Sequence, residues 1–510
     1  MRSKRALLNV ISTLLFQLIT IICGFIVPRL IIGTYGSGVN GVITSISQFL
    51  GYIILLESGI GGVVKAALYK PLAIMDKESI SSIIKATEKF FRYVALAFIG
   101  YSFVLAGIFP LLVKYDFGWF YVFSLVLIIG FSTFGQYYFG VTYQILLQAD
   151  QKNYVISLLR LGTTIVNTII IVVLVKFGVG IHLVKLGSSL VFIIRPLVLN
   201  YYVKKKYQLI HNCKPNNDAV KQRWDGLGHH LAYFLHRRAD VIVLTIFANI
   251  KEVSVYSVYN LVVLGIENIT VTLSSGFEAA FGNMIAKEEM GVLNKNFRIY
   301  EFISFSVTTT LFTSAALLIL SFVTVYTRGI SDVNYYRPMF AYVLILAEAI
   351  YCIRLPYFSV TMAAGHFKQT RNGAFIEAFF NIVLSVILVQ QYGVVGVAIA
   401  TLCAMLFRTF QYAIYLSNKV LHRSVWLFWG RCIVNITAAM ITIYIAKLLP
   451  VTKIDSYFLW FLHACRITLI ATAVTLPLNT VIYYQDAKSF IEVVKRLWIQ
   501  KADKQDEKLQ

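Results

Sequence analysis

The amino-acid sequence predicts an all-α polytopic membrane protein of about fourteen transmembrane helices, in two pseudo-symmetric six-helix lobes plus two extra helices. Three observations support this fold class. Hydrophobic residues make up 58% of the chain and charged residues only 14%, whereas soluble proteins carry about a quarter charged residues. Loops rich in basic residues alternate with loops that have few. A long-range repeat also relates the two halves of the chain.

The apolar runs define the predicted spans, because a helix needs about 20 mostly apolar residues to cross a bilayer. The first run follows Met1-Arg-Ser-Lys-Arg5 and is longer than the apolar core of a cleaved signal peptide, so we expect this helix to be retained. The predicted spans are 6–32, 39–64, 93–113, 119–147, 154–175, 181–203, 229–249, 253–283, 300–325, 336–364, 370–390, 393–418, 425–447 and 458–484.

Lysine and arginine set the predicted orientation. If the N-terminus is cytoplasmic, the cytoplasmic segments hold several-fold more basic residues than the outer loops, which is the usual bias of membrane proteins. We therefore expect both termini in the cytoplasm. The basic residues counted with the outer loops are Lys114, Lys176, Lys185, Lys251, Arg328, Arg337, Lys447 and Lys453.

The same bias accounts for the net charge of +22. The chain has no basic surface domain with interleaved aromatic residues, so we expect no nucleic-acid partner. The six cysteines are scattered without a CxxC pair, and we expect neither disulfides nor a metal site.

Once the basic residues counted with the loops are set aside, those left inside the predicted spans are all arginines: Arg29, Arg160, Arg195, Arg237, Arg238, Arg354, Arg408, Arg431 and Arg466. Intramembrane charge is costly and normally faces a bundle interior or a water-filled cavity. Arginine also binds phosphate through two parallel hydrogen bonds. Arg29 and Arg431 lie near span ends, where we expect the side chains to extend to lipid headgroups.

The two halves repeat with the same internal spacing. The stretches Asp150–Gly178 and Gly365–Gly393 are equally long, each contains an asparagine, and the helix that follows carries Arg195 in one half and Arg408 in the other. Lobes of six helices have the same orientation, which is typical of transporters that bind substrate between the lobes near the bilayer midplane. We predict an N-lobe at 1–203, a cytoplasmic linker at 204–228, a C-lobe at 229–420, helices 13 and 14 at 421–485, and a cytoplasmic amphipathic, charged tail at 486–510.

Motifs of the common enzyme classes are absent from the sequence. There is no GxxxxGK[ST] phosphate loop, no HExxH or GxSxG, and no metal-ligand spacing of Cys and His. The outer loops are too short to hold the catalytic residues of a membrane polymerase or glycosyltransferase. We therefore predict a transporter that is not an enzyme and has no catalytic residue, metal or cofactor.

This pattern resembles the multidrug/oligosaccharidyl-lipid/polysaccharide exporter superfamily, and within it the bacterial polysaccharide repeat-unit flippases of the Wzx type. The resemblance covers about residues 1–485 and rests on Val27–Gly36, Leu147–Asp150, Phe177-Gly178, Tyr392–Gly396 and Arg238-Ala-Asp240. The seventh span departs from the family pattern because its start carries His229, His230 and His236, followed by two consecutive arginines.

The resemblance implies a substrate, an oligosaccharide repeat unit on undecaprenyl pyrophosphate. It would be flipped from the inner to the outer leaflet of the bacterial plasma (inner) membrane during capsule, exopolysaccharide or O-antigen assembly. Expected partners are this lipid-linked substrate, membrane lipids, and possible polymerase and other assembly-pathway proteins. Alternatives are a lipid II flippase and a multidrug exporter of the same superfamily. A membrane polymerase or glycosyltransferase is a further alternative, and the short outer loops argue against it. Cationic drugs would favour an acidic cavity, which the intramembrane arginines oppose.

The deep arginines are the candidate ligands of the pyrophosphate and sugar. Our candidates are Arg237, Arg238 and Arg354, followed by the repeat-related pair Arg195 and Arg408. The alternative is structural pairing with buried acids. Asp240 lies three residues from Arg237 on the same helical face, and Glu377 or Glu348 could partner Arg354 or Arg408.

Without an ATP site, coupling to H⁺ or Na⁺ is the natural energy source. The candidate coupling residues are Glu57, Asp240, Glu267, Glu278 and Glu377, with structural pairing as the alternative. We expect transport by alternating access around an arginine-lined cavity.

Overall fold

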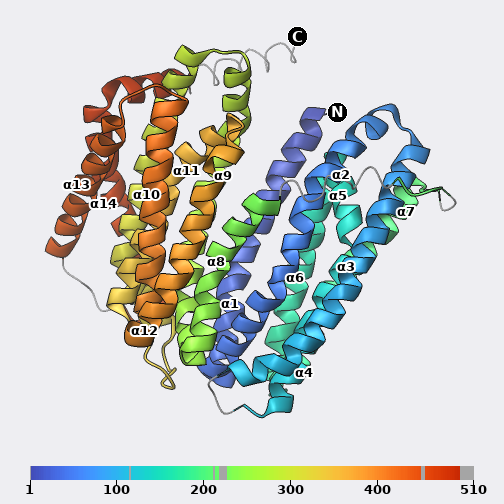
Figure 1. The fold of residues 1–510 in the computed structure, drawn as a ribbon. Coiled ribbons are helices and arrows are strands. Elements are labelled where there is room, and N and C mark those ends of the chain that lie inside the picture. The colour runs from blue at the N-terminus through green and yellow to red at the C-terminus, as the bar shows by residue number, and fades with distance from the viewer. Residues whose placement is uncertain are drawn as a thin grey trace, which may run out of the picture. The chain divides into compact units, whose positions relative to one another are not determined.

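A computed structural model describes residues 2–113, 117–210, 213–216, 227–449, 454–493 and 495. In this part of the chain the regular elements are helices (Figure 1). They are α1 (Arg2–Leu50), the 3₁₀ turn η1 (Gly51–Ile53), α2 (Ile54–Ile74), α3 (Lys77–Leu112), α4 (Trp119–Phe139), α5 (Val141–Ala149), α6 (Asn153–Lys176), α7 (Ile181–Tyr207), α8 (Leu227–Phe247), α9 (Ile250–Ala286), α10 (Met290–Tyr326), α11 (Pro338–Ala363), α12 (Phe367–Lys419), α13 (Trp426–Leu448) and α14 (Tyr457–Ile482).

Two of these helices are each two spans joined at a glycine. α1 changes direction at Gly36 (φ 87°, ψ 166°) and α12 at Gly393 (φ 53°, ψ −131°), backbone conformations that glycine adopts at little cost. The described residues contain 11 helices that are long and apolar enough to cross a membrane. Dividing α1 and α12 at their glycines and adding α8 gives the predicted total of about fourteen segments.

The chain divides into two compact units, each described here by itself. Unit 1 comprises Met1–Val258, Gly329–Val333 and Val389–Val394, and unit 2 comprises Tyr259–Arg328, Asn334–Leu388 and Val395–Gln510. The predicted division into lobes at 1–203 and 229–420 stays a prediction.

In unit 1 each long helix packs against the next in a continuous series. α1 contacts α6, α6 contacts α7, α7 contacts α4, and α4 contacts α3, as the blue to cyan helices of Figure 1 show. Beyond the Gly36 bend, the Ser37 amide and hydroxyl donate to the Asp332 carboxylate at 2.8 and 2.7 Å. A side chain from the link between α10 and α11 thus caps the second half of α1, where the helix dipole favours negative charge.

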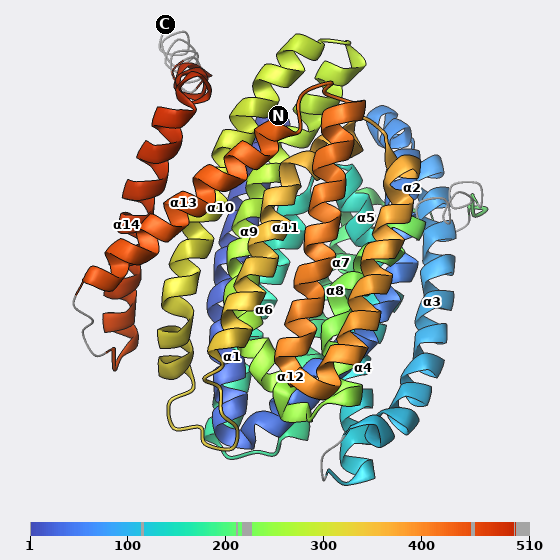
Figure 2. The ribbon, with the colours of Figure 1, turned by 60° about the vertical axis from the view of Figure 1, so that its left-hand side comes forward.

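In unit 2, α10 is the central helix and contacts α11, α13 and α14. α13 and α14 also pack against each other, as the red helices of Figure 2 show. An aromatic cluster that includes Phe297, Tyr357 and Phe428 fills the core between α10, α11 and α13. The chain then continues as a helix over 484–493, most of which lies in the predicted tail at 486–510.

Candidate functional site

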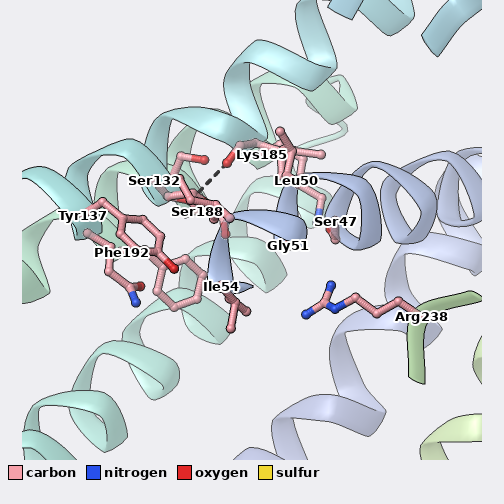
Figure 3. A pocket seen from close by; sticks show the side chains of 15 residues that line it. Ser47, Leu50, Gly51, Ile54, Ser132, Tyr137, Lys185, Ser188, Phe192 and Arg238 are labelled. Carbon is pink, nitrogen blue, oxygen red and sulfur yellow. Dashed lines mark hydrogen bonds between the residues drawn. The ribbon is translucent and has the colours of Figure 1, made fainter. Parts of the chain in front are cut away.

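A cavity of about 360 Å³ lies within unit 1. Its walls come from the second half of α4, the first half of α7, the end of α1 with the η1 turn and the first residue of α2, and one residue of α8. The lining carries two cations, Lys185 and Arg238, and no carboxylate among the described residues. Figure 3 shows Arg238 reaching toward Gly51 and Ile54, while Lys185, Ser188 and Phe192 come from α7.

The end of α1 positions the side chain of Arg238. Its Nη1 donates to the Gln48 side-chain oxygen at 2.8 Å and to the Gln48 carbonyl oxygen at 3.2 Å. A Cβ on Gly51 would lie 2.0 Å from the same nitrogen. A side chain at this position would make the flexible guanidinium move, so Gly51 allows the position that the bonds to Gln48 hold in the cavity wall.

Lys185 is a cavity residue that the charge count assigned to the outer loops, although the predicted span 181–203 includes it; the structure places it inside α7, so only that count was wrong. α7 begins at Ile181, so Lys185 lies beyond the first helical turn, and it lines the cavity. Among the described residues it forms neither an ion pair nor a hydrogen bond. Its spacing from Ser188 and Phe192 is three and seven residues, one helix face, which is the signal that could have identified it.

Glu57, a candidate coupling residue, is linked to the cavity wall through Tyr137. Tyr137 lines the cavity, and its hydroxyl donates to the Glu57 carboxylate at 2.9 Å. Arg160 is the nearby cation of Glu57 and also donates to the Gln144 side chain at 3.0 Å. Glu57 is thus half-buried, and its carboxylate is hydrogen-bonded to Tyr137, a residue of the cavity wall.

Arg195, a predicted ligand, lies one side chain away from the cavity. Its guanidinium donates twice to the Thr163 hydroxyl, at 3.1 and 3.0 Å, and stacks 5.2 Å from the ring centre of Phe192, which lines the cavity. Arg237 is half-buried on α8 and is not one of the residues described as lining the cavity.

Arg354 and Arg408, the predicted ligands in the second half, are brought together in unit 2 by one carboxylate. Arg354 Nη1 lies 2.6 Å from one oxygen of Glu377, and Arg408 Nε lies 3.5 Å from the other. Arg408 also donates to Gln411 and to Tyr412. The side chains of the two arginines and Glu377 are all less than 10% exposed. This is the pairing that the sequence analysis left open for Glu377.

A second buried charge cluster surrounds Glu301 on α10, and no local sequence pattern predicted it. Its carboxylate, which is fully buried, binds Arg423, accepts from Tyr357 and lies 3.4 Å from Arg431. Arg431 also binds Asp486 at 2.7 Å. The expectation that Arg431 extends to headgroups was wrong, because these acids hold its side chain at 4% exposure.

The remaining candidate acids are distributed over α8 and α9. Asp240 is buried and accepts from the Tyr256 hydroxyl at 3.1 Å. Glu267 is buried on α9. The side chain of Glu278 lies outside the described residues, as do those of His229, His230 and His236. Within the described part of the chain, no cluster of His, Cys, Asp and Glu could hold a metal ion.

The fold is shared with solved membrane transporters. Lipid II flippase MurJ in its inward closed conformation aligns with a TM-score of 0.67 at 15% identity, over 94% of this chain and 99% of that one. The Vibrio cholerae MATE transporter VcmN in its bent form aligns with a TM-score of 0.54 at 14% identity. This alignment covers 83% of this chain and 99% of that one.

A transporter from Pyrococcus furiosus, described as a member of the MOP superfamily with a binding pocket of reversed polarity, aligns at 0.51 and 12% identity, over 80% of this chain and 96% of that one. No family model and no curated protein matches the sequence. The chain is therefore a multi-pass membrane protein with the fold of the multidrug/oligosaccharidyl-lipid/polysaccharide exporter superfamily.

Proposed function

We propose that this protein is a transporter that flips an anionic, lipid-linked oligosaccharide across the bilayer and binds its diphosphate in the unit 1 cavity. The observation that carries the proposal is the pair of cations, Arg238 and Lys185, in a cavity whose described lining has no carboxylate. Positive charge in a membrane interior is costly, and a charged ligand of opposite sign stabilises it. An anionic cargo would bring such a charge to the two cations when it enters the cavity.

The chemistry of the two side chains fits a diphosphate. Arg238 offers a planar fork that can bind two phosphate oxygens, and Lys185 offers a point charge on a flexible stem. The sugar of such a cargo needs a polar cavity, and its lipid tail can stay in the hydrocarbon region. The same cations would repel the cationic substrates of a drug exporter, so this alternative has less support.

The full proposal is a repeat unit on undecaprenyl pyrophosphate, flipped from the inner to the outer leaflet of the bacterial inner membrane by alternating access between the predicted lobes. Both termini would be cytoplasmic, and a polymerase and other assembly proteins would be partners. A lipid II flippase is the alternative that the cavity chemistry fits equally well, since lipid II carries the same diphosphate. Arg237 and Arg195 remain proposed ligands. For Arg354 and Arg408, the buried contacts with Glu377 favour a structural role.

The test is transport by purified protein in proteoliposomes. The cargo is a fluorescent undecaprenyl-diphosphate oligosaccharide, and a membrane-impermeant quencher reports which leaflet it occupies. We expect the wild type to move this lipid and Arg238→Gln or Lys185→Met to slow it at least about tenfold, the effect of about 1.4 kcal/mol. Arg92→Gln and Lys89→Met are matched controls, because both residues are exposed on α3.

Transport of the lipid at wild-type rate by both cavity variants would contradict the proposal. So would a wild type that moves cationic dyes and leaves the lipid in place.

A further inference from the structure

Three polar side chains face the cavity without a hydrogen-bond partner among the described residues. They are Thr133 and Gln136 on α4 and Ser188 on α7. The other cavity serines are already bonded to backbone, as Ser132 is to the Ile129 carbonyl at 3.1 Å and Ser189 to the Ile128 carbonyl at 2.8 Å. The polar side chains of the cavity thus fall into two groups. Some are already hydrogen-bonded to the helix backbone, and three can still bond to a ligand.

These available groups occupy two facing helix surfaces. On α4 the lining residues fall between Ile129 and Tyr137 at spacings of three and four, and on α7 they fall between Lys185 and Phe192 with the same spacing. α4 and α7 pack against each other. Ser188 comes one helical turn after Lys185, so a group next to a phosphate bound by Lys185 would meet the Ser188 hydroxyl and the α4 surface opposite.

Thr133, Gln136 and Ser188 therefore leave their hydrogen-bonding groups open to the cavity, where a ligand can bond to them. Hydroxyl and amide groups both donate and accept, which is the pattern that complements the hydroxyls of a sugar. A bare diphosphate needs donors only. Phe192 and Tyr137 add aromatic surface to the same walls.

We propose that Thr133, Gln136 and Ser188 recognise the sugar attached directly to the diphosphate, and so set the substrate specificity of the cavity. This inference rests on the proposed function, since it assumes that Lys185 and Arg238 bind the phosphates. It assigns sugar selection to one surface formed by α4 and α7.

The test compares the affinity of purified protein in nanodiscs for sugar-free undecaprenyl diphosphate with its affinity for the same lipid carrying one galactose, glucose or N-acetylglucosamine. We expect the wild type to bind at least one sugar-bearing lipid more tightly. Thr133→Val and Gln136→Leu should each reduce that ratio of affinities about 3- to 10-fold, the effect of one hydrogen bond. Both changes raise hydrophobicity and nearly preserve volume, so they are compatible with insertion.

Two further variants separate a lost hydroxyl from a disturbed helix. Thr133→Ser keeps the hydroxyl and should keep the wild-type ratio. Ser124→Ala changes α4 away from the cavity, where the hydroxyl bonds only to its own helix at the Phe120 and Tyr121 carbonyls, and should also keep it.

An unchanged ratio in Thr133→Val and Gln136→Leu, or a wild type that prefers none of the three sugars, would overturn the inference. Failure of the proposed function looks different. In that case the wild type would not bind even the sugar-free diphosphate, or Lys185→Met would leave this binding unchanged.

Discussion

Glu377→Gln tests whether the two deep arginines of unit 2 are structural. The glutamine keeps the size of the side chain and removes the charge that faces both arginines. Arg354 contacts the carboxylate at 2.6 Å and Arg408 at 3.5 Å, and the three side chains are buried. Removing the acid therefore leaves two positive charges without their shared counter-charge.

The size of the effect follows from these contacts. Removing one partner of a buried ion pair costs about 3–5 kcal/mol, because the other charge stays buried and uncompensated. Arg354 carries most of this cost. Arg408 keeps hydrogen bonds to Gln411 and Tyr412, and its longer contact to Glu377 adds less. We expect the free energy of unfolding to fall by about 3–5 kcal/mol in Glu377→Gln.

The assay is unfolding of the purified protein in detergent, followed by tryptophan fluorescence. The double variant Arg354→Met/Glu377→Gln should be more stable than Glu377→Gln alone, because it removes the better-paired of the two stranded charges. Glu289→Gln is the control, since Glu289 is exposed and should change stability by less than about 0.5 kcal/mol. A Glu377→Gln protein within about 1 kcal/mol of wild type would refute the reasoning and reopen a ligand role for these arginines.

Two further predictions concern packing in unit 1. Asp332→Asn should lower the free energy of unfolding by about 1–2 kcal/mol, because the charge-assisted bonds to Ser37 are lost; an unchanged unfolding curve would contradict the cap. Gly41→Ala should destabilise by about 1–3 kcal/mol, because its Cβ would lie 2.1 Å from the Ile250 carbonyl oxygen. Gly61→Ala has nothing within 4 Å and should be neutral or stabilising by up to about 1 kcal/mol, so equal shifts in the two glycine variants would contradict this packing.

The sequence was sufficient for the fold because each span must be apolar over its own length. Membrane helices satisfy their backbone hydrogen bonds internally, so hydropathy locates them one at a time. The glycine turns around Gly36 and Gly393 were visible as motifs, and both are bends between two spans. Local sequence therefore carries most of the information on the architecture.

The site was only partly predictable because it depends on which helices pack together. A lysine near a helix end can extend to the interface or point inward, and the packing of α4 on α7 places Lys185 in the cavity wall. Glu301 gave no local signal, since its partners Arg423 and Arg431 are more than a hundred residues away. Arg238 was a candidate from the sequence because an intramembrane arginine is conspicuous, and the structure places it in the cavity wall; its role as a ligand stays a prediction.

The most direct measurement for the central claim is the affinity of purified protein for undecaprenyl diphosphate, with uncharged undecaprenol as the reference lipid. The account predicts that the wild type binds the diphosphate and not the alcohol. It also predicts that Arg238→Gln and Lys185→Met each weaken binding at least about tenfold, with a larger loss in the double variant. Equal affinity for the two lipids, or wild-type affinity in the double variant, would contradict it.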